Sequence, residues 1–320
     1  MHGLLAVYRK ELEDHFSSTR FILLLTVILM VSLVTTYMVG TGLRKELEGF
    51  AKPALVFLLL FTSTGALFSL VQFIAFFGPL LGMVLGFDAI SRERAANTLS
   101  KLLAQPIYRD AVINGKFLAG LTIIGLMLTA ILLLIAGMGL WVLGVVPGGE
   151  EVGRLLVYLV ISVVYIGFWL AVAILFSTLF RGMATSALAA LALWIFLAFF
   201  LALGASLAAD ALAPVPPGAA TDAAALLRHE RTRELVASLS PITLYSQATA
   251  TILDPMRKTP RSLILMGPME RLSLSRFQTP LPLLQSALIV TPYLVSLVAL
   301  TVVCFGICYA CFMRQEIRST

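Results

Sequence analysis

Few residues in this sequence have the types and spacing that catalysis or metal binding requires. Three cysteines fall at positions i, i+4 and i+7 and so share one face of a helix: Cys304, Cys308 and Cys311. Thiolates on one face could bind a soft metal such as copper, but cysteine is also common as a small buried residue, and no other ligand accompanies these three. The histidines are far apart in the chain, at His2, His15 and His229. We therefore expect no metal site and no catalytic residue.

Phosphate chemistry is also missing from the sequence. A nucleotide-binding loop needs a glycine five residues before its Gly-Lys pair and a Ser or Thr directly after it. The one Gly-Lys pair, Gly115 and Lys116, has Asp110 and Phe117 at those positions. If ATP drives this protein, the ATP and its Mg²⁺ are bound by another subunit. We expect this chain to need no cofactor of its own.

The composition indicates a membrane protein. Hydrophobic residues make up 59% of the 320 residues and charged residues 12%, whereas soluble domains average about 45–50% and about 25%. Too little polar surface remains to cover a water-soluble fold. The net charge of +6 could suggest nucleic acid, but membrane proteins also retain Lys and Arg on their cytoplasmic side. We expect an integral membrane protein that binds no nucleic acid.

Six charge-free runs are long enough to cross a bilayer core of about 30 Å as helices. They comprise residues 21–39, 67–87, 117–145, 155–179, 183–207 and 284–312. The second lies within a longer charge-free stretch, 54–87, in which the polar cluster 62–65 favours a break and an interfacial or re-entrant segment before the span. The predicted fold class is all-α, a polytopic membrane protein with six transmembrane helices.

Basic residues predict the orientation. With six spans, both termini lie on one side, where the short loops and ends hold eleven Lys and Arg residues, against four on the other side. The remaining eight lie in the long loop 208–283, where the positive-inside rule does not apply. We expect a multi-pass protein of a prokaryotic cell membrane with both termini in the cytoplasm.

This topology predicts the order of the parts. They are a cytoplasmic amphipathic elbow helix at 1–20, the first five transmembrane helices at 21–207 with a cytoplasmic coupling segment at 88–116, an extracytoplasmic loop with short helices at 208–283, a sixth transmembrane helix at 284–313 and a cytoplasmic tail at 314–320. In the elbow helix, apolar residues recur at helical spacing over 4–16, and the charged residues, Glu11 among them, fall on the opposite side. Such a helix lies flat in the headgroup layer or packs on another cytoplasmic part.

The densest cytoplasmic charge cluster lies between the second and third spans. Ser91 is suited to cap a helix that continues through Leu99, Leu102 and Leu103, and Pro106 would end it. The three leucines form an apolar stripe that a purely solvated loop would not need. We expect this segment to dock on another protein.

Residues 83–118 read MVLGFDAISRERAANTLSKLLAQPIYRDAVINGKFL, which resembles the signature of the type-2 ATP-binding-cassette (ABC) export permeases. The matching positions are an acidic residue, a Gly-Thr-Leu-like step, a proline, an arginine and a Gly-Lys pair: Glu93, Asn97, Thr98, Leu99, Pro106, Arg109, Gly115 and Lys116. Asn97 replaces the usual glycine, and asparagine also tolerates tight local geometry. The six-span layout fits the same family, and the sequence resembles the permeases of nitrous-oxide-reductase maturation and other stand-alone bacterial or archaeal permeases.

The resemblance implies a half-size permease. In that family two copies, or one copy and a paralogous permease, form the pathway, and two copies of a cytoplasmic ABC ATPase bind beneath them and use ATP and Mg²⁺. It places the contact with the ATPase at about 91–109. The residues that we expect to couple the two proteins are Arg92, Glu93, Arg94, Thr98, Leu99, Leu102, Leu103, Pro106 and Arg109.

Small and polar residues within the spans predict helix packing and a pathway. Gly78, Gly82 and Gly86 repeat every four residues, which favours close helix contact, either within one copy or across a dimer. Hydroxyl groups and one amide could line the pathway: Thr35, Ser69, Gln72, Tyr165 and Ser186. Such a lining suits the export of an amphiphilic or hydrophobic substrate.

The sequence leaves two other functions open. A membrane scaffold or sensor that recruits a cytoplasmic partner would explain the leucine stripe, but it gives no reason for polar groups inside the spans. A secondary carrier driven by an ion gradient would need ionisable residues in the bilayer, and none of the six predicted spans contains His, Asp, Glu, Lys or Arg.

Overall fold

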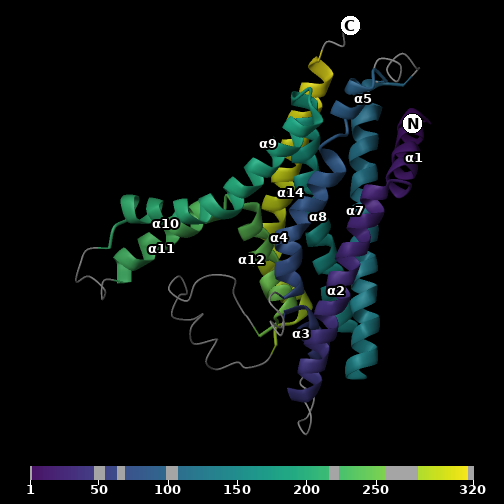
Figure 1. Ribbon diagram of the computed structural model, residues 1–320. Helices are drawn as coiled ribbons and strands as arrows, with labels where there is room; N and C mark the ends of the chain where they lie inside the picture. Colours follow the sequence, from purple (N-terminus) through teal and green to yellow (C-terminus); the bar gives the residue numbers. More distant parts are fainter. Residues whose placement is uncertain are drawn as a thin grey trace. The chain divides into compact units, whose positions relative to one another are not determined.

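The computed structural model describes residues 2–46, 55–62, 69–98, 107–215, 223–256 and 280–315. Every regular element in these ranges is a helix (Figure 1). The chain divides into two compact units. The first comprises Met1–Leu191 and Val298–Thr320, and the second comprises Ala192–Leu297.

Six helices in the described residues are long and apolar enough to cross a membrane, which confirms the predicted all-helical, six-span fold. They are α2 (Thr19–Glu46), the helix that begins with α4 (Leu70–Gly86), α7 (Arg109–Leu143), α8 (Gly149–Leu179), α9 (Met183–Ile195) with the π-helix η1 (Phe196–Phe200), and α14 (Leu283–Arg314). With its 35 residues, α7 is about 52 Å long at a rise of about 1.5 Å per residue. It therefore extends beyond a hydrocarbon core of about 30 Å.

In the first unit, α7 and α8 form the centre. Helix α8 packs against α4 and α7, and α7 also contacts α2 and α1 (His2–Phe16) (Figure 1). Apolar side chains fill these contacts, among them Ile124 and Ile131 on α7 and Ile166 and Trp169 on α8. In a membrane such close packing, rather than exclusion of water, holds helices together.

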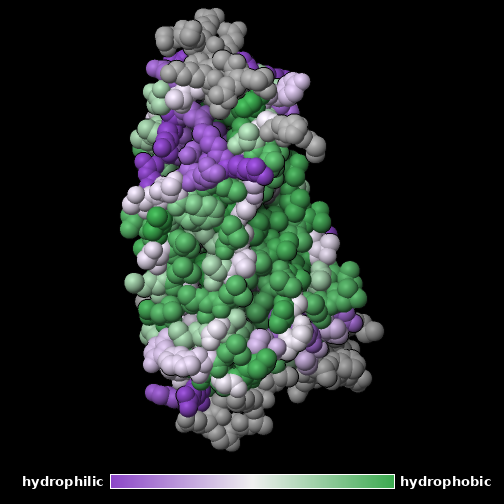
Figure 2. All heavy atoms as spheres, turned by 90° about the vertical axis from the view of Figure 1, so that its right-hand side faces the viewer, coloured by the Kyte–Doolittle hydropathy of each residue, from purple (hydrophilic) through white to green (hydrophobic). Residues whose placement is uncertain are grey.

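The lipid-facing character of the first unit is visible on its surface. Figure 2 shows a broad apolar band with a hydrophilic patch near one end, at the level at which Figure 1 places α1. Within this unit α2 exposes many large apolar side chains, including Leu23, Val27, Met30 and Val34. An apolar surface of this extent would be a liability in water and is the expected surface in lipid.

The first part of the charge-free stretch 54–87 forms a separate short helix, α3 (Val56–Thr62), which packs against α2, α4 and α7. Phe57 and Leu60 are fully buried, and Gly139 on α7 makes room for them, because a Cβ there would lie 2.6 Å from Leu60 Cδ1. Glu151 Oε1 accepts a hydrogen bond of 2.9 Å from the N–H of Phe57. The predicted break at 62–65 lies largely outside the described residues, since 63–68 are not described.

The second unit contains η1, α10 (Leu201–Leu212), α11 (Ala223–Ala237) and α12 (Pro241–Leu253). Helices α10 and α11 run side by side (Figure 1). The sequence predicts a span that ends at residue 207, whereas the helical run continues to Leu212, because no helix-breaking proline occurs before Pro214. The π-helix interrupts this run, and Ser240 Oγ donates to the carbonyl of Leu197 within it at 2.9 Å.

Candidate functional site

A buried lysine joins three helices at one end of the first unit. Lys116 Nζ on α7 lies 2.7 Å from Glu11 Oε1 on α1 and 2.8 Å from Glu93 Oε1 on α5 (Ser91–Ala95). The Lys116 side chain is only 4% exposed, and those of Glu11 and Glu93 are 11% and 13% exposed. A charge buried to this degree needs such partners. We call Glu11, Lys116 and Glu93 the ion triad.

Gly115 lets α1 approach α7 closely enough for the ion triad to form. A Cβ atom at Gly115 would lie 2.8 Å from Val7 Cγ1. Two turns further along α7, Thr122 Oγ1 lies 3.0 Å from Tyr8 Oη. The Gly-Lys pair thus has two roles, since the glycine admits α1 and the lysine binds its carboxylate. The prediction that Glu11 falls on the polar side of the helix, opposite the apolar residues, is wrong, because Glu11 is buried beside Lys116 of α7.

Lys10 offsets the second negative charge of the ion triad. Its Nζ lies 3.4 Å from Glu11 Oε1, 3.8 Å from Glu93 Oε1 and 3.3 Å from Asp14 Oδ2. Burial alone would raise the pKa of Glu11, but the ammonium groups of Lys116 and Lys10 together outweigh it and hold this pKa below its usual value. At neutral pH the ion pairs of the ion triad therefore hold α1, α5 and α7 together.

The lowered pKa of Glu11 predicts that acid weakens the attachment of α1. A carboxyl group whose pKa is lower in the folded protein stabilises the fold above its unfolded-state pKa of about 4.3, and this contribution is lost as the pH falls through the folded-state value. We expect Glu11→Gln to lower the melting temperature in detergent at pH 7. The difference from the unaltered protein should shrink as the pH falls below about 4.3. A difference that stays constant with pH would contradict this assignment.

Ser177 fixes the start of α5 to α8. Its Oγ accepts hydrogen bonds from the backbone N–H groups of Ile90 at 2.9 Å and Ser91 at 3.0 Å. N–H groups in the first turn of a helix have no partner within the helix, so α8 supplies the missing acceptor. The prediction that Ser91 caps this helix is wrong, because Ile90 occupies the N-cap position and Ser91 is the first helical residue.

We expect Ser177→Ala to lower the free energy of unfolding by about 1–3 kcal/mol, because two buried N–H groups would lose their acceptor. Ser17→Ala is the matched control, since Ser17 is exposed and its Oγ only donates to carbonyls of α1, the helix directly before it. Thermal unfolding in detergent, followed by tryptophan fluorescence, compares the two variants. Equal stability of both would show that water replaces the Ser177 hydroxyl.

Arg94 and Arg109 bind the residue that follows α14. Arg94 Nη2 donates to Gln315 Oε1 at 2.7 Å, and Arg109 Nη1 donates to the backbone carbonyl of Gln315 at 3.1 Å. Gln315 Nε2 and Arg94 Nη2 also donate to the carbonyl of Thr178 in the last turn of α8, at 2.7 and 3.3 Å. The end of α5, the start of α7 and the ends of α8 and α14 therefore meet at Gln315.

Helix α5 ends in a Schellman motif. The N–H of Asn97 donates to the carbonyl of Arg94, the N–H of Thr98 donates to that of Glu93, and Asn97 has a φ of 53°. Glycine favours this left-handed conformation, and asparagine tolerates it. The predicted continuation of this helix from Ser91 through Leu103 is wrong, because the left-handed Asn97 ends the helix before Leu99.

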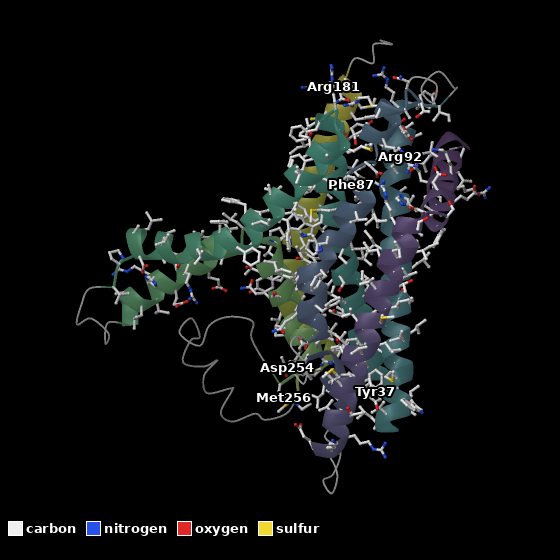
Figure 3. All side chains as sticks on the ribbon, in the orientation of Figure 1. Tyr37, Phe87, Arg92, Arg181, Asp254 and Met256 are labelled. Carbon is white, nitrogen blue, oxygen red and sulfur yellow. The ribbon has the colours of Figure 1, made fainter. Side chains whose placement is uncertain are left out.

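The outward surface of α5 and its final turn is exposed. Arg92 and residues 95–98 are exposed, and Figure 3 shows Arg92 near the same end as Arg181, which follows α8. We call Arg92 and residues 95–98 the exposed turn. Glu93 binds Lys116, and Arg94 and Arg109 bind Gln315, whereas the residues of the exposed turn are accessible.

Four of the residues predicted for coupling fall outside the described residues: Leu99, Leu102, Leu103 and Pro106. The other five lie in or directly beside the network of ion pairs and hydrogen bonds around α5. Glu93 belongs to the ion triad, Arg94 and Arg109 bind Gln315, and Arg92 and Thr98 belong to the exposed turn. Their role in coupling stays a prediction.

The three glycines of α4 face α8 of the same chain. A Cβ atom at Gly82 would lie 2.6 Å from the carbonyl oxygen of Ile166, and one at Gly86 would lie 2.8 Å from Ala173 Cβ. At Gly78 the nearest atom would be Ile166 Cγ1, at 3.0 Å. This close approach aligns the end of α4 with the end of α8 and so brings α5 to Ser177.

The residues predicted to line a pathway are not brought together as a group. Ser69 and Gln72 form a capping box at the start of α4. Tyr165 is fully buried and its Oη donates to the carbonyl of Ala75 at 2.7 Å. Ser186 is buried in α9, whereas Gln72 is exposed and Thr35 on α2 is half-buried. Only Gln72 and Thr35 of this set are accessible within one copy.

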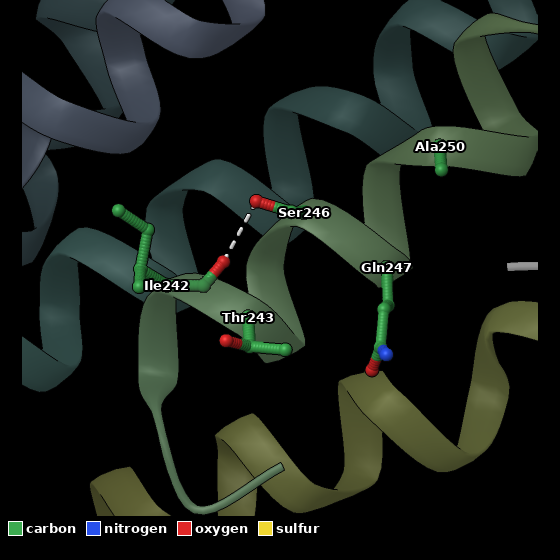
Figure 4. A pocket seen from close by; sticks show the side chains of 5 residues that line it. All are labelled: Ile242, Thr243, Ser246, Gln247 and Ala250. Atoms are coloured by element: carbon green, nitrogen blue, oxygen red, sulfur yellow. Dashed lines mark hydrogen bonds between the residues drawn. The ribbon is translucent and has the colours of Figure 1, made fainter. Parts of the chain in front are cut away.

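A shallow pocket of about 220 Å³ lies on α12 in the second unit. Its lining consists of Ile242, Thr243, Ser246, Gln247 and Ala250 (Figure 4). The Ser246 hydroxyl donates to the carbonyl of Ile242 at 2.8 Å. None of the residues predicted to line a pathway contributes to this pocket.

The cysteine face of α14 belongs to the first unit and is partly buried there. Cys308 is buried, and its Sγ is 3.8 Å from Thr178 Oγ1 on α8. Within the part of the chain that the structure describes, no three His, Cys, Asp or Glu side chains come together in a way that could hold a metal ion. Here Cys308 serves as a small packing residue.

Sequence reasoning missed three contributors to this site. Ser177 and Gln315 lie at the ends of apolar runs, where a single polar residue is unremarkable. Glu11 pairs with Lys116 across 105 positions of the chain. Lys116 stands directly before a long apolar run, and a buried lysine needs carboxylate partners. Acidic residues in the predicted elbow helix and in the coupling segment were therefore the available signal.

A family model described as "ABC-2 family transporter protein" matches residues 5–317. The chain is also 27% identical over 155 residues to the probable ABC transporter permease protein NosY of Stutzerimonas stutzeri. That alignment covers 48% of this chain and 50% of the relative, so it spans about half the length of the relative.

Proposed function

The chain belongs to the ABC-2 family of transporter proteins, and we propose that it is the permease subunit of an ATP-driven exporter. Membership of this family, together with six apolar helices, makes it an integral membrane permease. The sequence contains no nucleotide-binding loop, which agrees with a subunit that does not hydrolyse ATP. In the proposed transporter two cytoplasmic ABC ATPase subunits bind ATP and Mg²⁺ and drive the permease.

One observation carries this proposal, namely that α5 is fixed to several helices on its inner side and open on its outer side. Ser177 holds its start, the ion triad holds its middle and Arg94 holds its end. A force applied at the exposed turn would therefore reach α1, α7, α8 and α14 together. A loop that merely connected two spans would not need these attachments.

The proposed pathway lies between two copies of the chain, or between this chain and a paralogous permease. Gln72 and Thr35 are the accessible polar groups among the residues predicted for its lining. Because their surroundings are apolar, we propose an amphiphilic or hydrophobic substrate. The concentration of Arg and Lys around α5 favours a cytoplasmic location for this end, with both termini in the cytoplasm of a prokaryotic cell.

Capture of the ATPase tests this proposal. The permease is purified from its native membrane together with any ABC ATPase that it captures. ATP turnover of the complex is then compared with that of the isolated ATPase. We expect Arg92→Glu to reduce capture at least about tenfold, a change that corresponds to 1.4 kcal/mol. Arg44→Glu is the matched control, because Arg44 is an exposed arginine at the far end of α2.

Equal capture by both variants would remove the exposed turn from the interface. If no ABC ATPase co-purifies with the unaltered protein, the proposed function fails. The substrate class is tested separately in proteoliposomes, where ATP should drive the movement of a fluorescent phospholipid or a hydrophobic peptide. Movement that continues without ATP and collapses with an ion gradient would indicate a secondary carrier instead.

A further inference from the structure

Gln315 joins the last helix to α5 through a side chain that accepts and donates hydrogen bonds at the same time. Its Oε1 accepts from Arg94 at 2.7 Å, and its Nε2 donates to the carbonyl of Thr178 at 2.7 Å. The carbonyls in the last turn of a helix lack a partner within the helix, so the amide satisfies an acceptor that α8 itself leaves open.

Only a carboxamide can form both side-chain hydrogen bonds of Gln315. A glutamate could still accept from Arg94, and more strongly because both groups would be charged, but it could not donate to Thr178. An alanine could do neither. The contact from Arg109 goes to the backbone carbonyl of Gln315, so it does not depend on the side chain.

Two other contacts of the C-terminal half of α14 run to α7 and α8. The ring of Phe305 stacks on that of Phe117, with centroids 4.3 Å apart, and Cys308 Sγ lies 3.8 Å from Thr178 Oγ1. The side chain of Gln315 therefore provides the hydrogen bond by which α5 holds the end of α14.

We propose that Gln315 is a positioning residue that makes the last turn of α14 move together with α5 when the ATPase acts. This proposal rests on the proposed function, since it needs an ATPase that displaces α5. Through Gln315 the displacement reaches the sixth span directly, in addition to the helices that follow α5 in the chain.

Hydrogen–deuterium exchange on the complete permease–ATPase complex tests the link. Backbone exchange is measured for residues 90–98 and 309–315, with and without a non-hydrolysable ATP analogue. In the unaltered complex we expect the nucleotide to change exchange in both segments. In Gln315→Ala the nucleotide should change exchange in residues 90–98 only, and basal exchange in the end of α14 should rise about tenfold, as expected for the loss of about 1.4 kcal/mol.

Two further variants separate a link from a purely structural role. Gln315→Glu keeps the bond to Arg94 and should preserve the nucleotide response of both segments. Arg314→Ala alters the exposed neighbouring residue and should also preserve it. A nucleotide response of α14 that survives in Gln315→Ala would overturn the proposal, as would a response confined to residues 90–98 in the unaltered complex. Failure of the ATPase to bind at all would instead count against the proposed function.

Discussion

Replacing Lys116 with methionine should remove about 3–5 kcal/mol from the stability of the first unit, the cost of breaking a buried ion pair by removing one partner. The Lys116 side chain is 4% exposed and lies within 2.8 Å of two carboxylates. Without its ammonium group, Glu11 and Glu93 would face each other in a buried setting, and the half-exposed Lys10, at 3.4 and 3.8 Å, would offset their charges only in part. Either one carboxyl group becomes protonated or α1 detaches from α7.

The measurement is thermal unfolding of the purified protein, combined with limited proteolysis within α1. Arg20→Met is the matched control, because Arg20 also pairs with a carboxylate, Asp88 Oδ2 at 3.1 Å, but its side chain is 66% exposed. Exposed pairs contribute at most about 1 kcal/mol. We expect a large effect for Lys116→Met and a small one for Arg20→Met.

A triple variant tests whether uncompensated charge causes the loss of stability. Glu11→Gln and Glu93→Gln, added to Lys116→Met, remove the unpaired charges and should recover part of the lost stability. If the triple variant is less stable than Lys116→Met alone, the loss arises from packing around Lys116 and not from uncompensated charge.

The second large effect is expected at Gly82. A Cβ atom there would lie 2.6 Å from the carbonyl oxygen of Ile166 and 2.9 Å from the backbone nitrogen of Leu170. Neither atom can move aside, because both belong to the backbone of α8. Gly82→Ala should therefore push α4 away from α8 and cost about 2–3 kcal/mol, within the range for overpacked cores.

Two other glycines give this prediction a graded control. At Gly78 the added methyl group meets the side chain of Ile166, which can rotate, so the loss should be smaller. At Gly125 on α7 a Cβ would have no described heavy atom within 4 Å, and alanine favours the helix over glycine by about 1 kcal/mol. Melting temperatures should fall in the order Gly125→Ala, Gly78→Ala, Gly82→Ala. A different order would mean that α4 and α8 adjust their spacing freely.

The spans could be predicted from the sequence because their signal is local. A run of about 20 apolar residues determines a membrane helix without reference to any other part of the chain. The tolerance of Asn97 for a tight turn was equally local, and Asn97 does adopt the left-handed conformation. The ends of the helices are harder to predict, because an apolar run marks only the part of a helix that lies in lipid. Helix α7 begins at Arg109, eight positions before its predicted span.

The network around α5 could not be predicted, because each of its contacts joins distant parts of the chain. Glu11 looks like a surface residue until Lys116 is placed beside it. Ser177 and Gln315 gain their roles only from the approach of α4 to α8 and from the position at which α14 ends. Hydrophobic periodicity reports which face of a helix is buried, but it does not report which charge a neighbouring helix will bring.

The pairing of Glu11 with Lys116 also constrains how the protein is made. Translation produces the acidic partner 105 residues before the basic one, so α1 leaves the ribosome long before α7 exists. Until then its carboxylate lacks the buried ammonium group and must stay hydrated. Attachment of the N-terminal helix is therefore a late step of biogenesis, and it requires that the third span has already been inserted the right way round.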